Sequence, residues 1–97
     1  MVNKLERIER TLREIKPFLE EQYKVKRIGV FGSYLRGEQK ATSDLDLLVE
    51  FIEPISLFDF LRLEDSLEQK LGIKVDLVMS DVLKPRIKDK IKEVSYV

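Results

Sequence analysis

The chain has 97 residues, of which 43% are hydrophobic, and its 18 basic residues balance 18 acidic ones. This composition is typical of one small globular domain, and no apolar run approaches the roughly 20 residues that a helix needs to span a bilayer. Cysteine and histidine are absent, which excludes disulfides, thiolate and imidazole metal sites and Ser-His catalysis, and leaves carboxylates as the only evident general bases.

An amphipathic helix is predicted first. Apolar residues recur at spacings of three and four, with charged residues between them, at Leu5, Ile8, Leu12, Ile15 and Leu19. Such a stripe is more often core than a partner-binding face, although a heptad pattern also serves helix pairing. Pro17 predicts a kink or a restart, because an interior proline removes a hydrogen bond and clashes with the preceding turn. The segment lacks the apolar core of a signal peptide, so we expect a cytoplasmic protein.

A short strand and a glycine-serine turn follow. The apolar run Arg27–Phe31 predicts the strand, and Gly32 after it allows a tight turn and the close approach of a ligand. Ser33 stands at the N-cap or in the first turn of a very short helix that Gly37 would close. The backbone N–H groups at that helix start favour phosphate, and Arg36 adds a cation one turn on.

Two aspartates lie two residues apart in the next predicted strand, Ser43–Val49. Side chains of a strand alternate between its faces, so Asp44 and Asp46 point to one face and Leu45 and Leu47 to the other. Two converging carboxylates repel each other and resist burial unless a cation neutralises them. Oxygen ligands of this kind suit Mg²⁺ or Mn²⁺, which complete their coordination with water and substrate phosphates.

A second long helix is predicted between Ser56 and Gly72. Ser56 and Asp59 have the spacing of a capping box, and Gly72 is the residue expected just past a helix end. The apolar positions noted on this helix are Phe60, Leu61, Leu67 and Leu71.

A third carboxylate, Asp76, lies in the predicted strand Ile73–Met79, on the face opposite to Val75 and Leu77. The roughly 20 residues since the preceding strand, mostly helical, favour a parallel right-handed crossover. If the two strands are neighbours, Asp76 joins Asp44 and Asp46, shares a metal ion with them and accepts the proton of an attacking hydroxyl.

A last helix is predicted from Pro85 through Ile91, with residues 94–97 packing back behind it. The predicted fold is therefore an α/β domain with a small mixed sheet of three to four strands and flanking helices. The segment from Asp44 to Asp76 carries nine acidic and three basic residues, which suits cations and not a nucleic-acid groove. The basic residues between Lys84 and Lys92 either contact a phosphate or a partner, or form a solvated helix face.

These motifs together resemble the nucleotidyltransferase superfamily typified by DNA polymerase beta, and more narrowly its minimal nucleotidyltransferases, often paired with HEPN proteins as antitoxin and toxin. The resemblance rests on Phe31-Gly32-Ser33-x-x-Arg36-Gly37, Ser43-Asp44-x-Asp46-Leu47-x-Val49 and Val75-Asp76-Leu77. It implies a nucleotidyltransferase fold over residues 1–97 as one domain, with ATP as substrate and two Mg²⁺ or Mn²⁺ ions. Asp44, Asp46 and Asp76 would be the catalytic and metal-binding residues, and the nucleotide-binding residues would be Gly32, Ser33, Arg36 and Ser43.

The function that the resemblance implies is transfer of AMP from ATP to a hydroxyl, with tyrosine expected, of a partner HEPN ribonuclease toxin. One alternative is a non-catalytic module that binds nucleotide or masks its partner by contact alone. A second is a subunit that modifies a small molecule. We expect no direct nucleic-acid or membrane partner, and homo-oligomerisation stays open.

Each site residue also has a purely structural interpretation. Gly32 and Ser33 are common in turns and caps, Asp44 and Asp46 could cap turns, and Asp76 could pair with Lys74 or an arginine. These interpretations do not jointly explain three acids on apolar strands.

Overall fold

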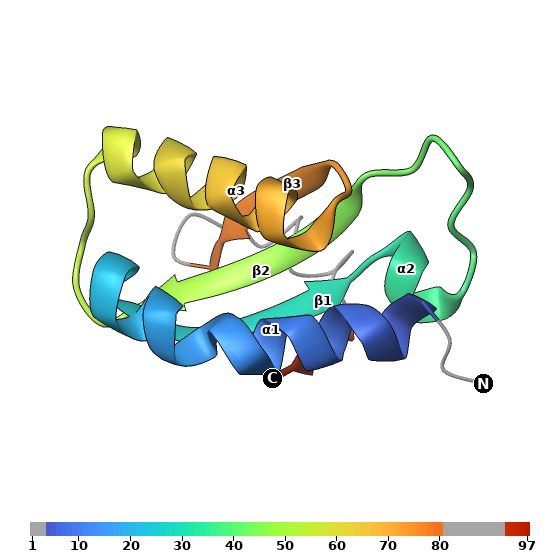
Figure 1. Cartoon of the computed structure of the whole chain (residues 1–97), viewed down its shortest axis with the longest axis horizontal. Coiled ribbons are helices and arrows are strands. Elements are labelled where there is room, and N and C mark those ends of the chain that lie inside the picture. Colours follow the sequence, from blue (N-terminus) through green and yellow to red (C-terminus); the bar gives the residue numbers. More distant parts are fainter. Residues whose placement is uncertain (1–3, 81–92) are drawn as a thin grey trace.

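The structure is a computed structural model, and it describes residues 4–80 and 93–97. Seven elements follow one another in this part of the chain (Figure 1): α1 Lys4–Tyr23, β1 Val25–Phe31, α2 Ser33–Arg36, β2 Leu45–Phe51, α3 Leu57–Leu71, β3 Val75–Met79 and β4 Ser95–Tyr96. The helix predicted over 85–91 and the basic segment 84–92 lie outside the described residues. No helix within the described ranges is long and apolar enough to cross a membrane.

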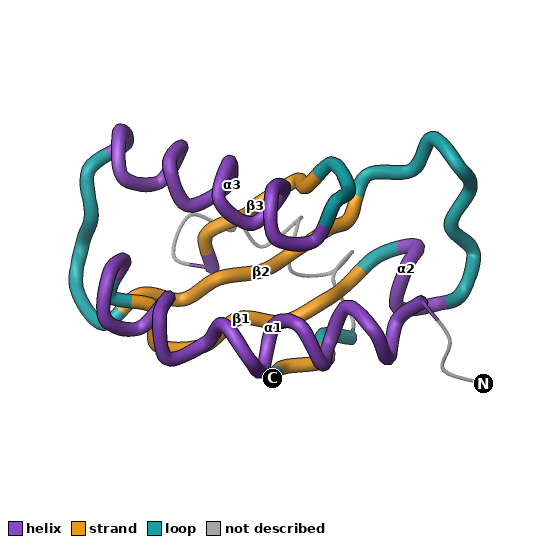
Figure 2. The backbone as a smooth tube through the Cα atoms, viewed as in Figure 1, coloured by secondary structure: helices purple, strands orange, loops and turns teal. Residues whose placement is uncertain are grey.

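The four strands form one mixed sheet in the order β3-β2-β1-β4 (Figure 2). β2 and β3 are parallel, as the long helical connection predicted, whereas β1 is antiparallel to both β2 and β4. The predicted mixed α/β fold is therefore confirmed, with the fourth strand supplied by the last residues of the chain. α1 and α3 lie on the same side of the sheet, and α2 lies at one end of it (Figure 1).

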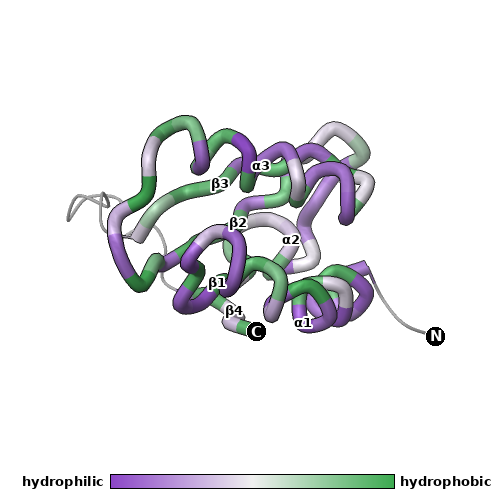
Figure 3. The backbone as a smooth tube through the Cα atoms, turned by 60° about the vertical axis from the view of Figure 1, so that its left-hand side comes forward, coloured by the Kyte–Doolittle hydropathy of each residue, from purple (hydrophilic) through white to green (hydrophobic). Residues whose placement is uncertain are grey.

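The core lies between these two helices and the sheet. Hydrophobic and hydrophilic residues alternate along both helices (Figure 3), and their apolar faces meet alternate residues of β1, β2 and β3. Burying each large side chain fully contributes about 1.5–3 kcal/mol. On α3 the fully buried residues are Leu63 and Leu67, while Leu61 is 52% exposed. The sequence analysis noted Leu61 and not Leu63 among the apolar positions of α3, whereas the structure buries Leu63.

Pro17 does not restart the first helix, which runs without interruption from Lys4 to Tyr23. The proline lies on an exposed part of the helix, so water can hydrogen-bond to the carbonyl group whose N–H partner is missing. The helix is held instead by its buried stripe, in which Ile8, Leu12 and Leu19 are at most 5% exposed.

Both ends of α3 form as their residue types predicted. The Ser56 hydroxyl accepts a hydrogen bond from the Asp59 N–H at 3.1 Å, which caps the N-terminus. Gly72 has φ +71° and its N–H donates to the Glu68 carbonyl, which closes the C-terminus in the left-handed conformation. These caps fix where the chain turns into β3.

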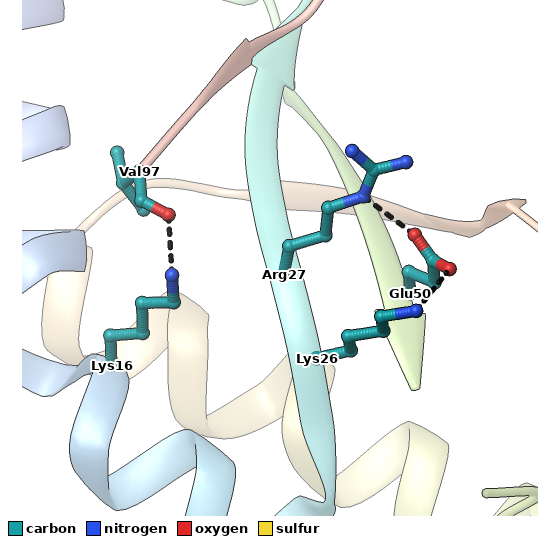
Figure 4. A network of polar contacts seen from close by, with 5 residues as sticks. All are labelled: Lys16, Lys26, Arg27, Glu50 and Val97. Atoms are coloured by element: carbon teal, nitrogen blue, oxygen red, sulfur yellow. Dashed lines mark hydrogen bonds and ion pairs between the residues drawn. The ribbon is translucent and has the colours of Figure 1, made fainter. Parts of the chain in front are cut away.

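The last residues pack tightly against β1. A Cβ atom at Gly29 would lie 2.6 Å from Val94 Cγ1 and 2.8 Å from the Ser95 carbonyl oxygen, so only glycine lets β4 approach here. Lys16 Nζ donates to the Val97 carbonyl at 2.7 Å (Figure 4). β4 is thus tied both to its neighbouring strand and to α1.

An exposed charge network joins β1 and β2 on the other face of the sheet. Arg27 Nε donates to Glu50 at 2.6 Å, and Lys26 Nζ lies 3.6 Å from the same carboxylate (Figure 4). The hydrogen bond from Arg27 lowers the pKa of Glu50. Because Lys26 and Arg27 are exposed and Glu50 is only half-buried, the network orients side chains more than it stabilises the fold.

Candidate active site

Gly32 brings the end of β1 directly against Asp46. Its φ of +75° and ψ of −149° lie in a region that is essentially restricted to glycine. A Cβ atom there would collide with the Asp46 carboxylate and would lie 3.0 Å from Asp46 Cγ. The missing side chain therefore serves two purposes, since it permits the turn and makes room for the carboxylate.

Asp46 and Asp76 are direct neighbours across the parallel strand pair. The register places Asp46 opposite Asp76, between the buried pairs Leu45–Val75 and Leu47–Leu77. Since those leucines and valines face the core, the two aspartates point to the opposite face of the sheet. The prediction that the strands carrying Asp46 and Asp76 lie side by side is therefore confirmed. Asp44 immediately precedes β2 and is exposed, as is Asp76, whereas Asp46 is half-buried.

The electrostatics of Asp46 reflect this arrangement. Partial burial is the largest cause that raises the pKa of Asp46, followed by the negative charges of Asp76 and Asp44, while Arg36 opposes the shift. Within residues 4–80 and 93–97, none of the three carboxylates forms an ion pair or a side-chain hydrogen bond. The alternative pairing of Asp76 with Lys74 is thus not seen in the described part of the chain.

The donor set fits hard divalent cations. A carboxylate cluster whose charges repel one another is stabilised by a cation, and Mg²⁺ and Mn²⁺ prefer oxygen ligands. No group of three acidic residues among those described is close enough to form a ready-made metal cage. Mg²⁺ usually takes only one or two carboxylates, together with water and substrate phosphates. Asp44, Asp46 and Asp76 stay the predicted ligands.

Ser33 is the first residue of α2, with Gly32 at the N-cap. Its hydroxyl forms no hydrogen bond within the described residues, so it is available to a ligand. Gly37 ends the helix in the left-handed conformation with φ +72°, as predicted, and the Glu38 N–H donates to the Ser33 carbonyl at 2.9 Å. Because α2 has only four residues, its dipole is small, and the turn offers individual N–H donors more than a strong helix end.

Arg36 and Ser43 have local partners. Arg36 Nε donates to Glu38 at 3.0 Å, and the Ser43 hydroxyl accepts from the Lys40 N–H at 2.8 Å. Ser43 thereby shapes the loop that leads into Asp44. The nucleotide-binding roles of these two residues stay predictions, and each would require the side chain to exchange or share its present partner.

A cavity of about 470 Å³ opens beside Asp44, and the sequence interpretation missed it. Segments far apart in sequence form its wall, namely the start of α1, α2, the loop before β2 and the α3–β3 turn, with Lys4, Tyr34, Ala41, Thr42, Ser43, Asp44, Gly72, Ile73 and Lys74. Tyr34 is only 3% exposed, and Lys4 Nζ lies 5.6 Å from its ring centroid. No local motif marks Lys4 or Lys74, because only the tertiary fold brings them together.

Asp46→Asn should stabilise the metal-free protein near neutral pH. The folded-state pKa of Asp46 lies above the ordinary value of 3.8, so the folded state binds more protons than the unfolded state between those two pKa values, and stability falls as pH rises through that window. The gain from asparagine should therefore be full above the folded pKa and vanish below about pH 3.8. Urea unfolding in EDTA at pH 3.5 and 7.5, with Asp65→Asn as the control, measures it. A loss of stability at pH 7.5 would mean that Asp46 holds the fold together.

The fold and the carboxylate face define a nucleotidyltransferase. The family model described as "Nucleotidyltransferase domain" matches residues 12–95, and the chain belongs to this family. Membership of this family identifies the chain as a nucleotide-transferring enzyme. The protein adenylyltransferase MntA of Thermococcus cleftensis is 52% identical over 94 residues, which cover 96% of this chain and 95% of that protein.

Solved structures agree with this placement. A protein provisionally identified as a minimal nucleotidyltransferase superposes with a TM-score of 0.73 at 42% identity, with 88% of each chain covered. The same fold occurs in a complex of a tri-AMPylated Shewanella oneidensis HEPN toxin with its MNT antitoxin, at a TM-score of 0.66 and 19% identity, over 92% of this chain and 70% of that one. The latter similarity supports the fold alone.

Proposed function

We propose that this protein transfers AMP from ATP to a hydroxyl group, with tyrosine expected, of a HEPN-type partner and thereby acts as its antitoxin. The observation that carries the proposal is the packing of the Gly32 turn on Asp46, opposite Asp76, on a sheet face whose carboxylates lack partners among the described residues. The 52% identity to a protein adenylyltransferase supports AMP as the transferred group. We place the reaction in the cytoplasm, with residues 1–97 acting as one domain.

The chain's own residues would divide the work between nucleotide and acceptor. The backbone N–H groups of the Gly32 turn and the Ser33 hydroxyl would hold the phosphates beside Asp46. Divalent ions held by Asp44, Asp46 and Asp76 would neutralise phosphate charge and lower the pKa of the attacking hydroxyl. Asp76, exposed and without a partner in the described residues, would take the hydroxyl proton.

The proposed reaction is an in-line displacement at the α-phosphorus of ATP. The acceptor oxygen forms a bond to the α-phosphorus, the bond from that phosphorus to the bridging oxygen of the β-phosphate breaks, and pyrophosphate leaves. Apart from the proton that Asp76 would accept, the chain would contribute positioning and charge, so the placement of the carboxylates around the Gly32 turn would largely set the rate.

A protein acceptor agrees with the small size of the site. The described residues build a four-stranded sheet with its helices, and these offer little further surface with which to enclose both ATP and an acceptor. The exposed position of Asp44 and Asp76 leaves the carboxylate face accessible to a second macromolecule. The complex of a tri-AMPylated HEPN toxin with its MNT antitoxin, a protein of this fold, supports the proposal of a protein acceptor.

Labelled ATP distinguishes the proposed reaction from its alternatives. The chain should transfer the label from α-labelled ATP and Mg²⁺ to a purified HEPN protein encoded beside it, and γ-labelled ATP should leave that protein unlabelled. Label from the γ-position would indicate kinase chemistry. Tight binding of the pair without transfer of either label would favour the contact-only module, and labelling of a small molecule alone would favour the second alternative.

Ser33→Ala should weaken the use of ATP by about 1–2 kcal/mol, the scale of one hydrogen bond to a charged group, which corresponds to roughly 5- to 30-fold in kcat/KM. The backbone N–H donors remain, so transfer should persist. Initial rates over a range of ATP concentrations measure the loss. Ser66→Ala, on α3 and outside the candidate site, serves as the control. An unchanged rate in Ser33→Ala would remove the serine from the phosphate site.

A further inference from the structure

The two backbone N–H groups that flank Asp76 donate to carboxylates of α3. The Val75 N–H donates to Glu68 Oε2 at 2.8 Å, and the Leu77 N–H donates to Glu64 Oε2 at 3.2 Å. Both hydrogen bonds are partly buried, and α3 runs alongside β3 (Figures 1 and 2). β3 is the outer strand in the described sheet, so no described strand pairs with these N–H groups on that side.

The spacing of residues along α3 and along β3 explains why two glutamates can accept from two N–H groups of the strand. Four residues along a helix rise by about 6 Å, and two residues along a strand advance by about 6.6 Å. Glu64 and Glu68 therefore present their carboxylates at nearly the same interval as the alternate N–H groups of β3. Since successive N–H groups of a strand point to opposite edges, the N–H of Asp76 itself points toward β2. The segment that carries Asp76 is thus held from both sides.

We infer that Glu64 and Glu68 are positioning residues that hold Asp76 opposite Asp46 for nucleotide transfer. The inference rests on the proposed function, because it assigns Asp76 its role in the reaction. Hydrogen bonds to a carboxylate are shorter and roughly twice as strong as neutral ones, so they restrain an outer strand better than water would. Asp65, between the two glutamates, is exposed and accepts a hydrogen bond from Gln69 Nε2 at 2.9 Å, which makes it a matched control on the same helix.

The test compares Glu64→Ala, Glu68→Ala, the two Glu→Gln variants and Asp65→Asn in the full chain. Two measurements are made on each protein. Amide hydrogen exchange at Val75 and Leu77 reports the hydrogen bonds directly and needs no activity. AMP transfer to the partner, measured over a range of ATP concentrations, separates kcat from KM. Thermal unfolding identifies any variant that must be studied at lower temperature to remain folded.

We expect the alanine variants to lose amide protection and to lower kcat about 10- to 100-fold, the usual scale for residues that orient a metal ligand, with KM for ATP changed less than about twofold. Glutamine retains an acceptor oxygen and should restore most of both quantities. Asp65→Asn should match the wild type. Full kcat in the alanine variants, or unchanged protection at both amides, would overturn the inference.

The failure of the proposed function gives a different result. In that case the wild type itself transfers no AMP. The affinity for Mn²⁺, measured by calorimetry, then replaces the rate of AMP transfer as the quantity compared between variants. Glu64→Ala and Glu68→Ala should then weaken Mn²⁺ binding as Asp76→Asn does, again by about 10- to 100-fold. Binding equal to that of Asp65→Asn would contradict a positioning role for the glutamates.

Discussion

Asp46→Asn should lower AMP transfer by about 10³-fold or more, because removing one group of a cooperating catalytic set costs on that scale. Asp46 lies against the Gly32 turn and is paired in register with Asp76, so it adjoins both halves of the site. Asparagine keeps the side chain's shape but loses the charge that binds divalent ions. Initial rates with α-labelled ATP and saturating Mg²⁺ measure the loss, and Asp44→Asn should behave in the same way.

The structural interpretation of the aspartates predicts a different pattern. If Asp46 were mainly a fold-holding group, asparagine would lower the melting temperature and leave the rate per folded molecule nearly unchanged. Partial burial, and after it the repulsion from Asp76 and Asp44, raise the pKa of Asp46 and predict the reverse, an unchanged or higher melting temperature without metal. Asp65→Asn removes a charge from an exposed position of α3 and should leave both quantities as in the wild type.

The sequence could predict that Asp46 and Asp76 lie next to each other, because two independent patterns lead to this result. Side-chain alternation places both carboxylates on the face opposite the leucines and valines, and the helical connection of α3 favours parallel strands. The register then brings Asp46 opposite Asp76. By contrast, the direction of β1 relative to β2 could not be predicted, because the short connection between these two strands allows either arrangement. Only the folded chain shows that they are antiparallel.

The hydrogen-bond partners of side chains were harder to predict from sequence than the face of a strand or helix on which each side chain lies. Arg36 donates to Glu38 across Gly37, whose left-handed backbone folds the chain back on itself. Glu64 and Glu68 belong to a charged helix surface that periodicity alone marks as solvated, and only the tertiary fold shows that β3 offers them N–H donors. A sequence pattern predicts which way a residue points, whereas its partner depends on an element elsewhere in the chain.

Gly32→Ala should be among the most damaging single-methyl changes in the site. The backbone at Gly32, with φ +75° and ψ −149°, lies in a region that costs a non-glycine residue about 1–3 kcal/mol. The new methyl group would also collide with the Asp46 carboxylate, and overpacking of this kind typically costs about 1–3 kcal/mol more. We therefore expect a loss of about 2–6 kcal/mol in the free energy of unfolding.

Gly37→Ala separates these two causes, because Gly37 has a similar φ of +72° but no described atom within 4 Å of the place that a methyl group would occupy. It lies in the ordinary left-handed region, with ψ 22°, so alanine should cost only about 1–2 kcal/mol there. Urea unfolding of both variants gives the stability difference, and AMP transfer at a temperature where both are folded gives the functional one. Gly32→Ala should lose transfer beyond its loss of stability, since the methyl group displaces Asp46 from its place beside the turn. If the two variants lose equal stability and keep equal rates, Asp46 does not depend on the space that Gly32 leaves.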